Sequence, residues 1–405
     1  MLLEYNFDGG TPGICEKAQA KRLRFIPYAN RSGCQWFYVC VRLTELPAEG
    51  QSTLEIKWPR LWQADECPQG MAAESITRLT SYDSFAQAAV NTIIQSHDLT
   101  NWVPVEKVEL RNDCSVLEIP VTAHGSPVYI ATQRPYTSGH YRKLLDDCSK
   151  QKRCTVQEIG RSQAGHPLYG FFFGNRNKNP LIHIQAYQHA TEFSGPLVAD
   201  AMIRLLCSEE YSHIVQNMAF DFVPVIDVDA LHYGMPLMLH QTREQPLRLE
   251  RHNPNREWAD PHWPEVKAVV ELIKDRLIEK SRYVVGLDMH NGWHKAHDSG
   301  ATYTIAAEDE AVNDGLIGRQ KEFAEFMYEH TDHQQPGTFW QHATGGRTFS
   351  AAFTNLTEAP AHTLEFSRHI WWDRENACFV KARPEFHERF AKQAIEALHA
   401  YFTQS

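Results

Sequence analysis

The sequence predicts an α/β domain with a mixed, mostly parallel sheet flanked by helices, preceded by a small all-β sandwich domain. Its 405 residues are enough for two domains. Residues 1–130 read as short β-rich segments separated by turn residues, without a long helical period. Over residues 131–405, segments with strand and helix patterns alternate, which is typical of an α/β domain with a buried sheet.

The composition is that of a globular protein, with 42% hydrophobic and 22% charged residues. The net charge of -10 argues against nucleic acid as the main partner, because a phosphate backbone selects for a basic face. No apolar stretch approaches the roughly 20 residues that a membrane-spanning helix needs. We therefore expect no nucleic-acid or membrane partner.

The cellular compartment is predicted from the cysteines and from the N-terminus. The nine cysteines are an odd number and contain no CxxC pair, which favours reduced thiols over a disulfide framework. The first residues lack the basic region and apolar run of a signal peptide. These features predict a cytoplasmic protein, and they leave its oligomeric state open.

In the N-terminal domain, β-branched and aromatic residues mark the expected strands. Turn residues such as those at 31–33 and 48–50 bound them. A series of short strands of this kind favours a β-sandwich. The expected strands cover residues 36–41, 52–57, 108–110 and 115–119.

The second domain is expected to open with a helix at about 138–150 and a hairpin with strands at 156–159 and 168–173. The turn 161–165 joins the two hairpin strands. Further strands are expected at 181–187, 221–226, 283–288 and 362–366. Further helices are expected at 196–206, 264–279, about 310–329 and about 385–402.

Residues with metal-binding side chains follow two of these strands. His189 and Glu192 come after the strand 181–187, and His290 comes after the strand 283–288. In open α/β sheets, ligands bind beyond the carboxyl ends of the strands, so these side chains are expected to converge. Two imidazoles and one carboxylate form a three-ligand site for one zinc ion with a fourth position open for water.

Glu365 lies within the apolar strand pattern 362–366. Burying an unpaired carboxylate is costly, so this residue is expected to have a chemical task. A carboxylate beside zinc-activated water can take a proton from it and pass that proton to a leaving amine. We predict that Glu365 is the catalytic base.

Taken together, these residues resemble the zinc metallocarboxypeptidase family over about residues 135–400. That family has the HxxE pair seen in His189 and Glu192, a later zinc histidine and a late glutamate base. Residues 255–258, Asn-Arg-Glu-Trp, resemble its Asn-Arg-x-Trp segment. The resemblance implies a zinc peptidase that cleaves the C-terminal residue of peptide or protein tails, with Asn255 and Arg256 holding the terminal carboxylate.

Three further residues, Asn253, Arg243 and Arg248, are compared with the residues that the family usually has at these places. Members usually carry Asp two residues before the Asn of the Asn-Arg pair, as the acceptor for the first zinc histidine, and here Asn253 occupies that place. The resemblance also implies an arginine that stabilises the oxyanion before this segment, for which we favour Arg243 or Arg248. The β-rich N-terminal region resembles that of the cytosolic carboxypeptidase subgroup.

Substrate preference is predicted from Arg347. Residues 344–348 resemble the family loop that lines the pocket for the C-terminal side chain. A cation there would favour an acidic C-terminal residue, so we hypothesise a preference for Glu or Asp. The alternative is that Arg347 is a solvated residue after a Gly-Gly turn.

Other catalytic sites have weaker support. Residues 160–164 come close to a GxSxG nucleophile elbow around Ser162, but they end in Ala and lie in a hairpin. His290, His294 and His297 form a rival metal set, but Gly292 interrupts it and His189 and Glu192 would then have no role.

Two alternative functions stay open. A zinc amidohydrolase of the aspartoacylase or desuccinylase type would share the HxxE pair, the late histidine, the Asn-Arg pair and the glutamate, but would act on acylated amino acids. An inactive binding protein on the same scaffold is the second alternative, with Asn253 as its main support. The long β-rich N-terminal region and Trp258 favour the peptidase.

Overall fold

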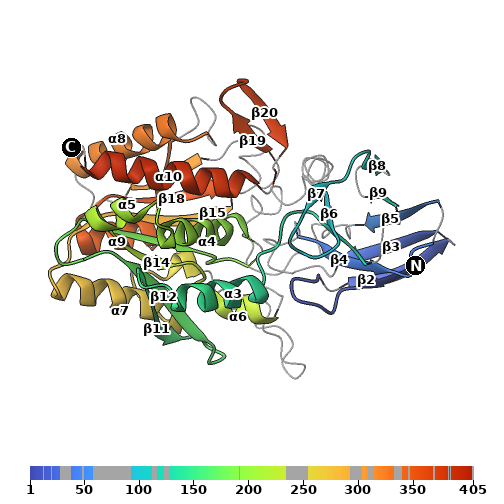
Figure 1. Cartoon of the computed structure of the whole chain (residues 1–405), viewed down its shortest axis with the longest axis horizontal. Helices are drawn as coiled ribbons and strands as arrows, with labels where there is room; N and C mark the ends of the chain where they lie inside the picture. The colour runs from blue at the N-terminus through green and yellow to red at the C-terminus, as the bar shows by residue number, and fades with distance from the viewer. Residues whose placement is uncertain are drawn as a thin grey trace. The chain divides into compact units, whose positions relative to one another are not determined.

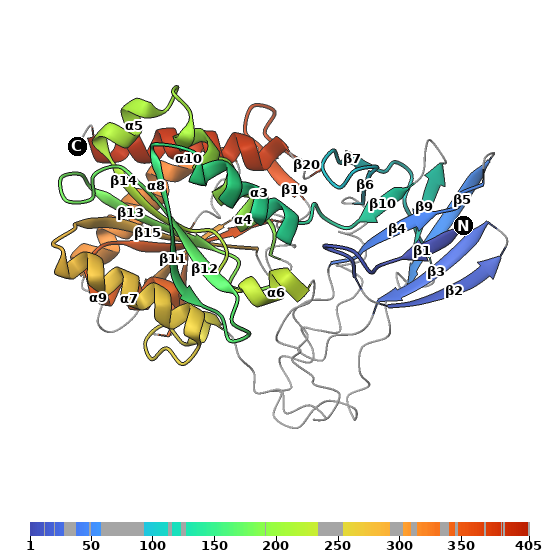
Figure 2. The ribbon, with the colours of Figure 1, turned by 60° about the horizontal axis from the view of Figure 1, so that its bottom comes forward.

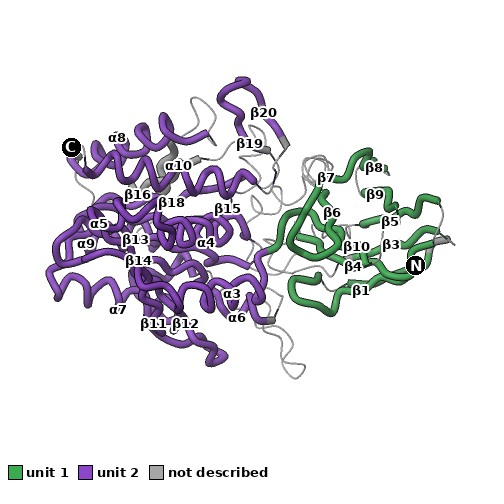
Figure 3. Tube along the Cα trace, viewed as in Figure 1, with its two compact units in different colours: residues 1–135, 297–299 green, residues 136–296, 300–405 purple. Residues whose placement is uncertain are grey.

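In the computed structural model, the described part of the chain divides into two compact units (Figure 3). Unit 1 consists of the described residues of Met1–Pro135, and unit 2 of the described residues from Tyr136 onward. The described residues are 1–11, 13–19, 21–27, 38–47, 50–57, 93–111, 116–122, 127–190, 192–233, 254–291, 303–308, 314–332, 340–344, 347–367, 370–381, 383 and 385–403.

The described strands of unit 1 form two sheets, each of five strands (Figure 1). The first has the order β1 (Leu2–Glu4), β4 (Cys40–Thr44), β10 (Val128–Ala131), β6 (Ile94–Ser96) and β7 (Val103–Pro104). The second has the order β2 (Gly13–Gln19), β3 (Arg22–Pro27), β5 (Gln51–Lys57), β9 (Val116–Thr122) and β8 (Glu109–Arg111).

A single apolar core joins the two sheets of unit 1. Val41 and Ile130 contribute from the first sheet, and Phe25, Ile56 and Ile119 from the second, all of them fully buried. Two sheets that share one core through their inner faces form a sandwich. The all-β region predicted for the N-terminus is therefore confirmed.

Unit 2 is built on an eight-stranded mixed sheet. Its three central neighbour pairs, β14 with β13, β13 with β15 and β15 with β18, are parallel, while β11, β12 and β16 add antiparallel pairs. The strand order is β11 (Cys154–Arg161), β12 (Pro167–Phe173), β14 (Ala219–Val223), β13 (Leu181–Ala186), β15 (Tyr283–Asn291), β18 (Ala361–Phe366), β16 (Tyr303–Glu308) and β17 (Trp340–Thr344).

Helices cover both faces of this sheet (Figure 2). α4 and α10 pack together on one face, and α7 and α9 lie on the other. The described helices of the unit are α3 (Ser138–Ser149), α4 (Ser194–Cys207), α5 (Ser212–Asn217), α6 (Val228–Tyr233), the 3-10 turn Pro254–Arg256, α7 (Pro264–Ile278), α8 (Asp314–His330), α9 (Phe349–Thr357) and α10 (Glu385–Thr403). A separate hairpin joins β19 (Ile370–Asp373) and β20 (Cys378–Lys381).

The central strands have the sequence that a doubly covered sheet requires. Every residue of β13 and of β18 is buried, as expected for the central strands of a sheet that is covered on both faces. The helix ends follow local rules, since Pro264 starts α7 and the Thr348 side chain accepts a hydrogen bond from Ala351 N at the start of α9. The predicted α/β class is confirmed.

The predicted elements that are present differ from the observed ones mainly at their ends, whereas strands β16, β17, β19 and β20 were not predicted. β15 continues through Asn291, three residues beyond the predicted end, and β14 covers Ala219–Val223 instead of 221–226. The strand predicted at 36–41 is found at Cys40–Thr44, and residues 36 and 37 lie outside the described part of the chain. In the described residues, no helix is both long and apolar enough to cross a membrane.

A buried histidine in β13 makes the stability of unit 2 depend on pH. His183 is fully buried, its Nε2–H donates to Gln185 Oε1 at 3.1 Å, and burial lowers its pKa to about 4. The neutral imidazole is therefore stabilised by folding. The contribution of His183 to the free energy of unfolding is complete above pH 6.5, the pKa of this residue in the unfolded chain. The contribution is lost as the pH falls from 6.5 through about 4.

We therefore predict a shallower pH dependence of unfolding in His183→Gln. Between pH 6.5 and 4, the slope of the unfolding free energy should fall by up to about 1.4 kcal/mol per pH unit, which corresponds to one proton. Urea unfolding at several pH values measures this slope. His213→Gln, at an exposed histidine, is the control, and equal slopes in wild type and His183→Gln would contradict the prediction.

Candidate active site

A sharp turn of the chain after β13 places His189 and Glu192 at the carboxyl edge of the sheet. β13 ends at Ala186, and Tyr187 adopts a left-handed conformation with φ of 58°, which turns the chain sharply. Asp227 N donates to Tyr187 O at 2.9 Å and fixes this turn against the segment that follows β14. This path of the backbone places His189 and Glu192 just after the end of β13, which is the position that the sequence predicted.

His290 lies inside β15 and not after it, because this strand is longer than predicted. It is paired in register with Glu365 on the parallel strand β18. Residues in register on neighbouring strands point to the same face of a sheet, and so do residues two positions apart on one strand. His290, Glu365 and Asp288 therefore share a face.

Three metal-binding side chains meet at this point. His189 Nδ1 lies 3.1 Å from one carboxylate oxygen of Glu192, and His290 Nδ1 lies 2.8 Å from the other. The three ligand atoms all lie within 4.8 Å of one another. Two imidazole nitrogens and one carboxylate are the donor set of catalytic zinc sites, so the residues fit one zinc ion.

Burial and charge act together on these ligands. Burial raises the pKa of Glu192, but the charges and hydrogen bonds of His189 and His290 outweigh it and hold that pKa well below its usual range. Burial lowers the pKa of His290, and the carboxylates of Asp288 and Glu192 outweigh this effect and raise it. Glu192 is therefore ionised and ready to bind a cation.

Asp288 is a site residue that the sequence reasoning missed. Its Oδ2 accepts a hydrogen bond from His290 Nε2 at 2.9 Å, on the side of the ring away from Glu192. The same carboxylate accepts from Gln185 Nε2 at 3.2 Å and from Gln188 Nε2 at 2.6 Å. A carboxylate behind a metal-binding histidine fixes its tautomer and orientation. The signal in the sequence was that Asp288 and His290 lie two positions apart, which places them on the same face if the strand continues through both.

A second layer supports this carboxylate. Trp258 Nε1 donates to Gln188 Oε1 at 2.8 Å, and the Trp258 side chain is almost fully buried. Asn255 Oδ1 accepts from Phe349 N at 3.0 Å, and Asn255 Nδ2 lies 3.5 Å from His290 Nε2. The Asn255–Trp258 segment, which was predicted to bind substrate, therefore also holds the surroundings of His290.

We predict that Asp288→Asn weakens zinc binding by about 10- to 100-fold, because an amide in this place no longer holds His290 by charge. Zinc affinity is measured by competition with a chromophoric chelator. Asp146→Asn serves as the matched control, since Asp146 is exposed. Unchanged zinc affinity in a folded Asp288→Asn protein would show that Asp288 does not support the ligand.

Glu365 is the fourth member of the site. It is buried, and its Oε2 has no hydrogen-bond partner within the described part of the chain. Burial raises its pKa to about 7, with smaller opposing effects from His290 and His189 and smaller raising effects from Glu192 and Asp288. A carboxylate with a pKa near neutrality and one free oxygen is suited to exchange protons during a reaction.

The predicted substrate-binding arginines are at the surface. Arg256 is exposed, and its Nη1 donates to Asn255 O at 2.7 Å. Arg347 is also exposed, and its carbonyl oxygen accepts from Trp258 N at 3.2 Å, so the segments around both arginines are adjacent. Five residues considered from the sequence lie outside the described residues, namely Arg243, Arg248, Asn253, His294 and His297.

The hairpin residue Ser162 is not arranged as a nucleophile. Its hydroxyl donates to Asp229 Oδ1, and His166 Nδ1 donates to the same oxygen at 2.7 Å. Asp229 Oδ2 also accepts from Ala164 N at 2.9 Å. Asp229 therefore accepts three hydrogen bonds from the hairpin turn, so this group of residues has the structural role of holding the turn.

Comparison with known proteins agrees with this site. Residues 141–271 match the family model described as zinc carboxypeptidase, whose members bind one zinc ion. The match includes His189, Glu192 and the Asn255–Trp258 segment. No match was found among curated protein sequences.

Solved structures share the fold over the whole chain. A metallo-carboxypeptidase from Burkholderia cenocepacia has 17% sequence identity and a TM-score of 0.73, over 99% of this chain and 98% of that one. One from Pseudomonas aeruginosa, in complex with (2-guanidinoethylmercapto)succinic acid, has 14% identity and a TM-score of 0.75 over the same shares. A protein provisionally named carboxypeptidase A from Shewanella denitrificans OS-217 has 18% identity and a TM-score of 0.77, over 100% of this chain and 99% of that one.

Proposed function

Because the chain belongs to the zinc carboxypeptidase family by its match over residues 141–271, we propose that it hydrolyses the C-terminal peptide bond of peptides with Glu365 as its catalytic base. One observation carries this proposal. Glu365 Oε2, which is buried and has no hydrogen-bond partner among the described residues, lies on the same sheet face as the ligand His290, on the neighbouring strand. The ligand His290 and the base Glu365 are thus held by the same pair of buried strands, β15 and β18, while His189 and Glu192 follow β13.

In the proposed reaction, the zinc ion acts as a Lewis acid and Glu365 transfers protons. A bound zinc ion held by His189, Glu192 and His290 supplies Lewis acidity, which acidifies water and polarises the scissile carbonyl. Glu365 Oε2 takes the proton from the attacking water and later delivers it to the nitrogen of the leaving amino acid. Burial raises the pKa of Glu365 to about 7 in the metal-free protein. The positive charge of a bound zinc ion would lower this pKa and favour the carboxylate form, which accepts the proton.

Asn255 and Arg256 are proposed to bind the free C-terminal carboxylate of the substrate. The Arg256 guanidinium is exposed at the edge of the site and presents a planar fork of donors that matches a carboxylate. Asn255 is buried within 3.5 Å of His290, so it links this anchor to the metal ligands. Arg243 and Arg248 remain our candidates for stabilising the oxyanion.

The proposal is tested with matched peptides carrying a free or an amidated C-terminus. A carboxypeptidase releases the last residue from the free peptide and cleaves the amidated one far more slowly, because Arg256 then has no carboxylate to bind. N-acyl amino acids in the same panel test the amidohydrolase alternative. Preferred cleavage of these compounds would favour the amidohydrolase, and zinc binding without any hydrolysis would favour the inactive binding protein.

For Arg347 we propose a role in preference for acidic C-terminal residues. Its segment is joined to the Asn255–Trp258 segment by the Trp258 N to Arg347 O and Phe349 N to Asn255 Oδ1 hydrogen bonds. Because the side chain is exposed, the effect should be modest. An exposed charge pair contributes about 0.2–1 kcal/mol, which is roughly a 1.5- to 5-fold change in rate.

The measurement for Arg347 is kcat/KM for peptides ending in Glu and in Leu. Wild type should favour Glu, and Arg347→Gln should reduce that preference, whereas Arg319→Gln on α8 should leave it unchanged. Faster cleavage of the Leu peptide by the wild-type enzyme would refute the acidic preference.

Two finer assignments are also proposals. An odd number of cysteines without a CxxC pair supports a cytoplasmic location, where thiols stay reduced. The β-sandwich of unit 1 is compatible with the domain order of the cytosolic carboxypeptidase subgroup. Fractionation of cells tests the location, and comparison of activity on acidic and unrelated peptide tails tests the subgroup.

A further inference from the structure

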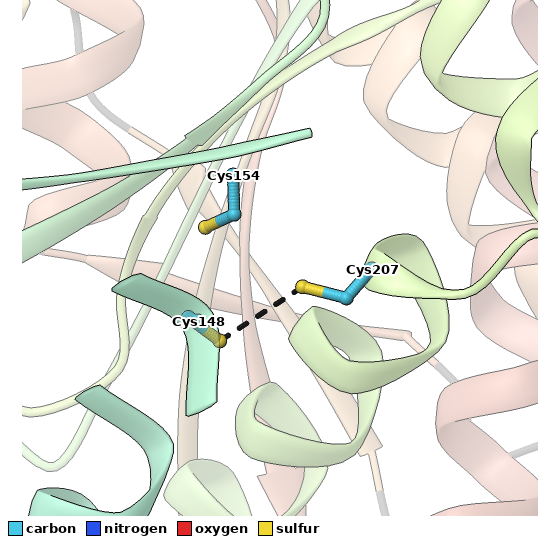
Figure 4. Close-up of side chains that lie close together, drawn as sticks. All are labelled: Cys148, Cys154 and Cys207. Atoms are coloured by element: carbon cyan, nitrogen blue, oxygen red, sulfur yellow. Dashed lines mark hydrogen bonds between the residues drawn. The ribbon is translucent and has the colours of Figure 1, made fainter. Parts of the chain in front are cut away.

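Three cysteines that are far apart in the sequence meet at one point of unit 2 (Figure 4). Cys148 lies in the last turn of α3, Cys154 is the first residue of β11, and Cys207 is the last residue of α4. The three sulfur atoms lie within 4.8 Å of one another, and those of Cys148 and Cys207 are 3.9 Å apart. Figure 4 shows the three side chains close together, with a dashed line that joins the sulfur atoms of Cys148 and Cys207.

This thiol cluster, defined as Cys148, Cys154 and Cys207, is separate from the active site. α4 starts at Ser194, two residues after Glu192, and ends at Cys207. A helix rises about 1.5 Å per residue, so the two ends of α4 are about 20 Å apart. The thiol cluster and the zinc ligands are therefore two separate sites that share no residue.

The cluster is reachable, and positive charge lies near it. Cys148 and Cys154 are buried, whereas Cys207 is partly exposed and provides the access. Arg153 Nη1 donates to Cys207 O at 3.4 Å, and Arg204 lies one helical turn before Cys207 on α4. Both guanidinium groups are also paired with carboxylates, Arg153 with Glu209 and Arg204 with Asp147 and Asp200. They therefore offset only part of the negative charge that three thiolates would bring.

We propose that Cys148, Cys154 and Cys207 form a three-coordinate thiolate site for a soft monovalent metal ion, Cu(I). Three sulfur atoms placed in a plane around an ion at about 2.3 Å are separated by about 4.0 Å, close to the 3.9 Å between Cys148 and Cys207. Thiolate ligands select soft ions such as Cu(I) and zinc. Structural zinc sites and iron–sulfur clusters use four protein ligands, and the described residues add no fourth His, Cys, Asp or Glu to this group.

The experiment uses the full-length protein, first loaded with one equivalent of zinc so that the active site is filled. Cu(I) is then titrated without oxygen in competition with the colorimetric chelator bicinchoninate. We expect one Cu(I) per chain, with zinc retained and peptidase activity unchanged. Each of Cys148→Ser, Cys154→Ser and Cys207→Ser should weaken Cu(I) binding by more than about 100-fold, since losing an outer-shell partner alone costs about 10- to 100-fold.

Cys15→Ser is the matched control, because Cys15 is exposed in unit 1 and lies outside the cluster. X-ray absorption of the wild-type protein with bound Cu(I) should show sulfur-only coordination, and this readout does not depend on how well a variant folds. The proposal is overturned if Cu(I) does not bind stoichiometrically, if it displaces zinc, if Cys207→Ser binds as wild type does, or if nitrogen or oxygen ligands are found.

Discussion

Glu365→Gln is expected to retain zinc and to lower kcat by about 100- to 10,000-fold, the range that a positioned general acid–base contributes. The amide has the same shape as the carboxylate but cannot accept the proton of the attacking water. Because Glu365 is not one of the three metal-binding side chains, the zinc content should remain one ion per chain. Steady-state kinetics and metal analysis of the same preparation measure both quantities.

The control for this variant is Glu358→Gln, at an exposed glutamate that ends α9 on the same segment of chain. It should have wild-type kcat and wild-type zinc content. Near wild-type turnover in Glu365→Gln would remove Glu365 from the role of base. Loss of zinc in that variant would instead place Glu365 among the ligands.

Glu192→Gln is expected to abolish activity by a different route, through loss of the metal. Glu192 is the only carboxylate of the three-ligand group, and its two oxygens face Nδ1 of His189 and Nδ1 of His290. Zinc affinity should fall by more than about 100-fold, beyond the 10- to 100-fold typical of outer-shell partners. Competition with a chelator gives the affinity, and added zinc should restore part of the activity.

Glu209→Gln is the control for Glu192→Gln, because Glu209 is highly exposed. It should bind zinc as tightly as wild type. Since the amide introduced by Glu192→Gln would still fill the same space between the two imidazoles, the variant should stay folded. Tight zinc binding in Glu192→Gln would mean that the ligand set is another one.

The sequence indicated His189, Glu192 and His290 as one group because their chemistry and their positions agree, and the structure brings these three side chains together. His189 and Glu192 follow a buried parallel strand, and such strand ends meet at one edge of a sheet. Glu365 stood out because a carboxylate in an otherwise apolar strand is costly to bury. Register was not predictable, and it is the register of β15 and β18 that brings Glu365 beside His290.

Residues that act through other residues were harder to find. Asp288 was expected only as the last residue of a strand, whereas the longer β15 places it two positions before His290 on the same face. Gln188 was not singled out from the sequence, although its side chain joins Trp258 to Asp288 by hydrogen bonds. The thiol cluster depends on contacts between α3, β11 and α4 that no spacing in the sequence indicates.

The ends of helices and strands were also hard to predict from the sequence. Local patterns predicted that a strand exists near residues 283–288 and a helix near 264–279, and both are present. They could not predict that β15 would continue through His290, because pairing with β18 supplies the backbone hydrogen bonds that extend it. Tertiary pairing, and not local propensity, sets that end of the strand.

Metal content measured together with peptidase activity tests most directly whether one zinc ion at His189, Glu192 and His290 supports catalysis. The purified chain should contain one zinc ion, lose activity on a peptide with a free C-terminus when a chelator removes that ion, and regain it with one equivalent of zinc. Glu365→Gln should bind the same single ion and stay inactive. Full activity of the metal-free wild-type protein would contradict this mechanism.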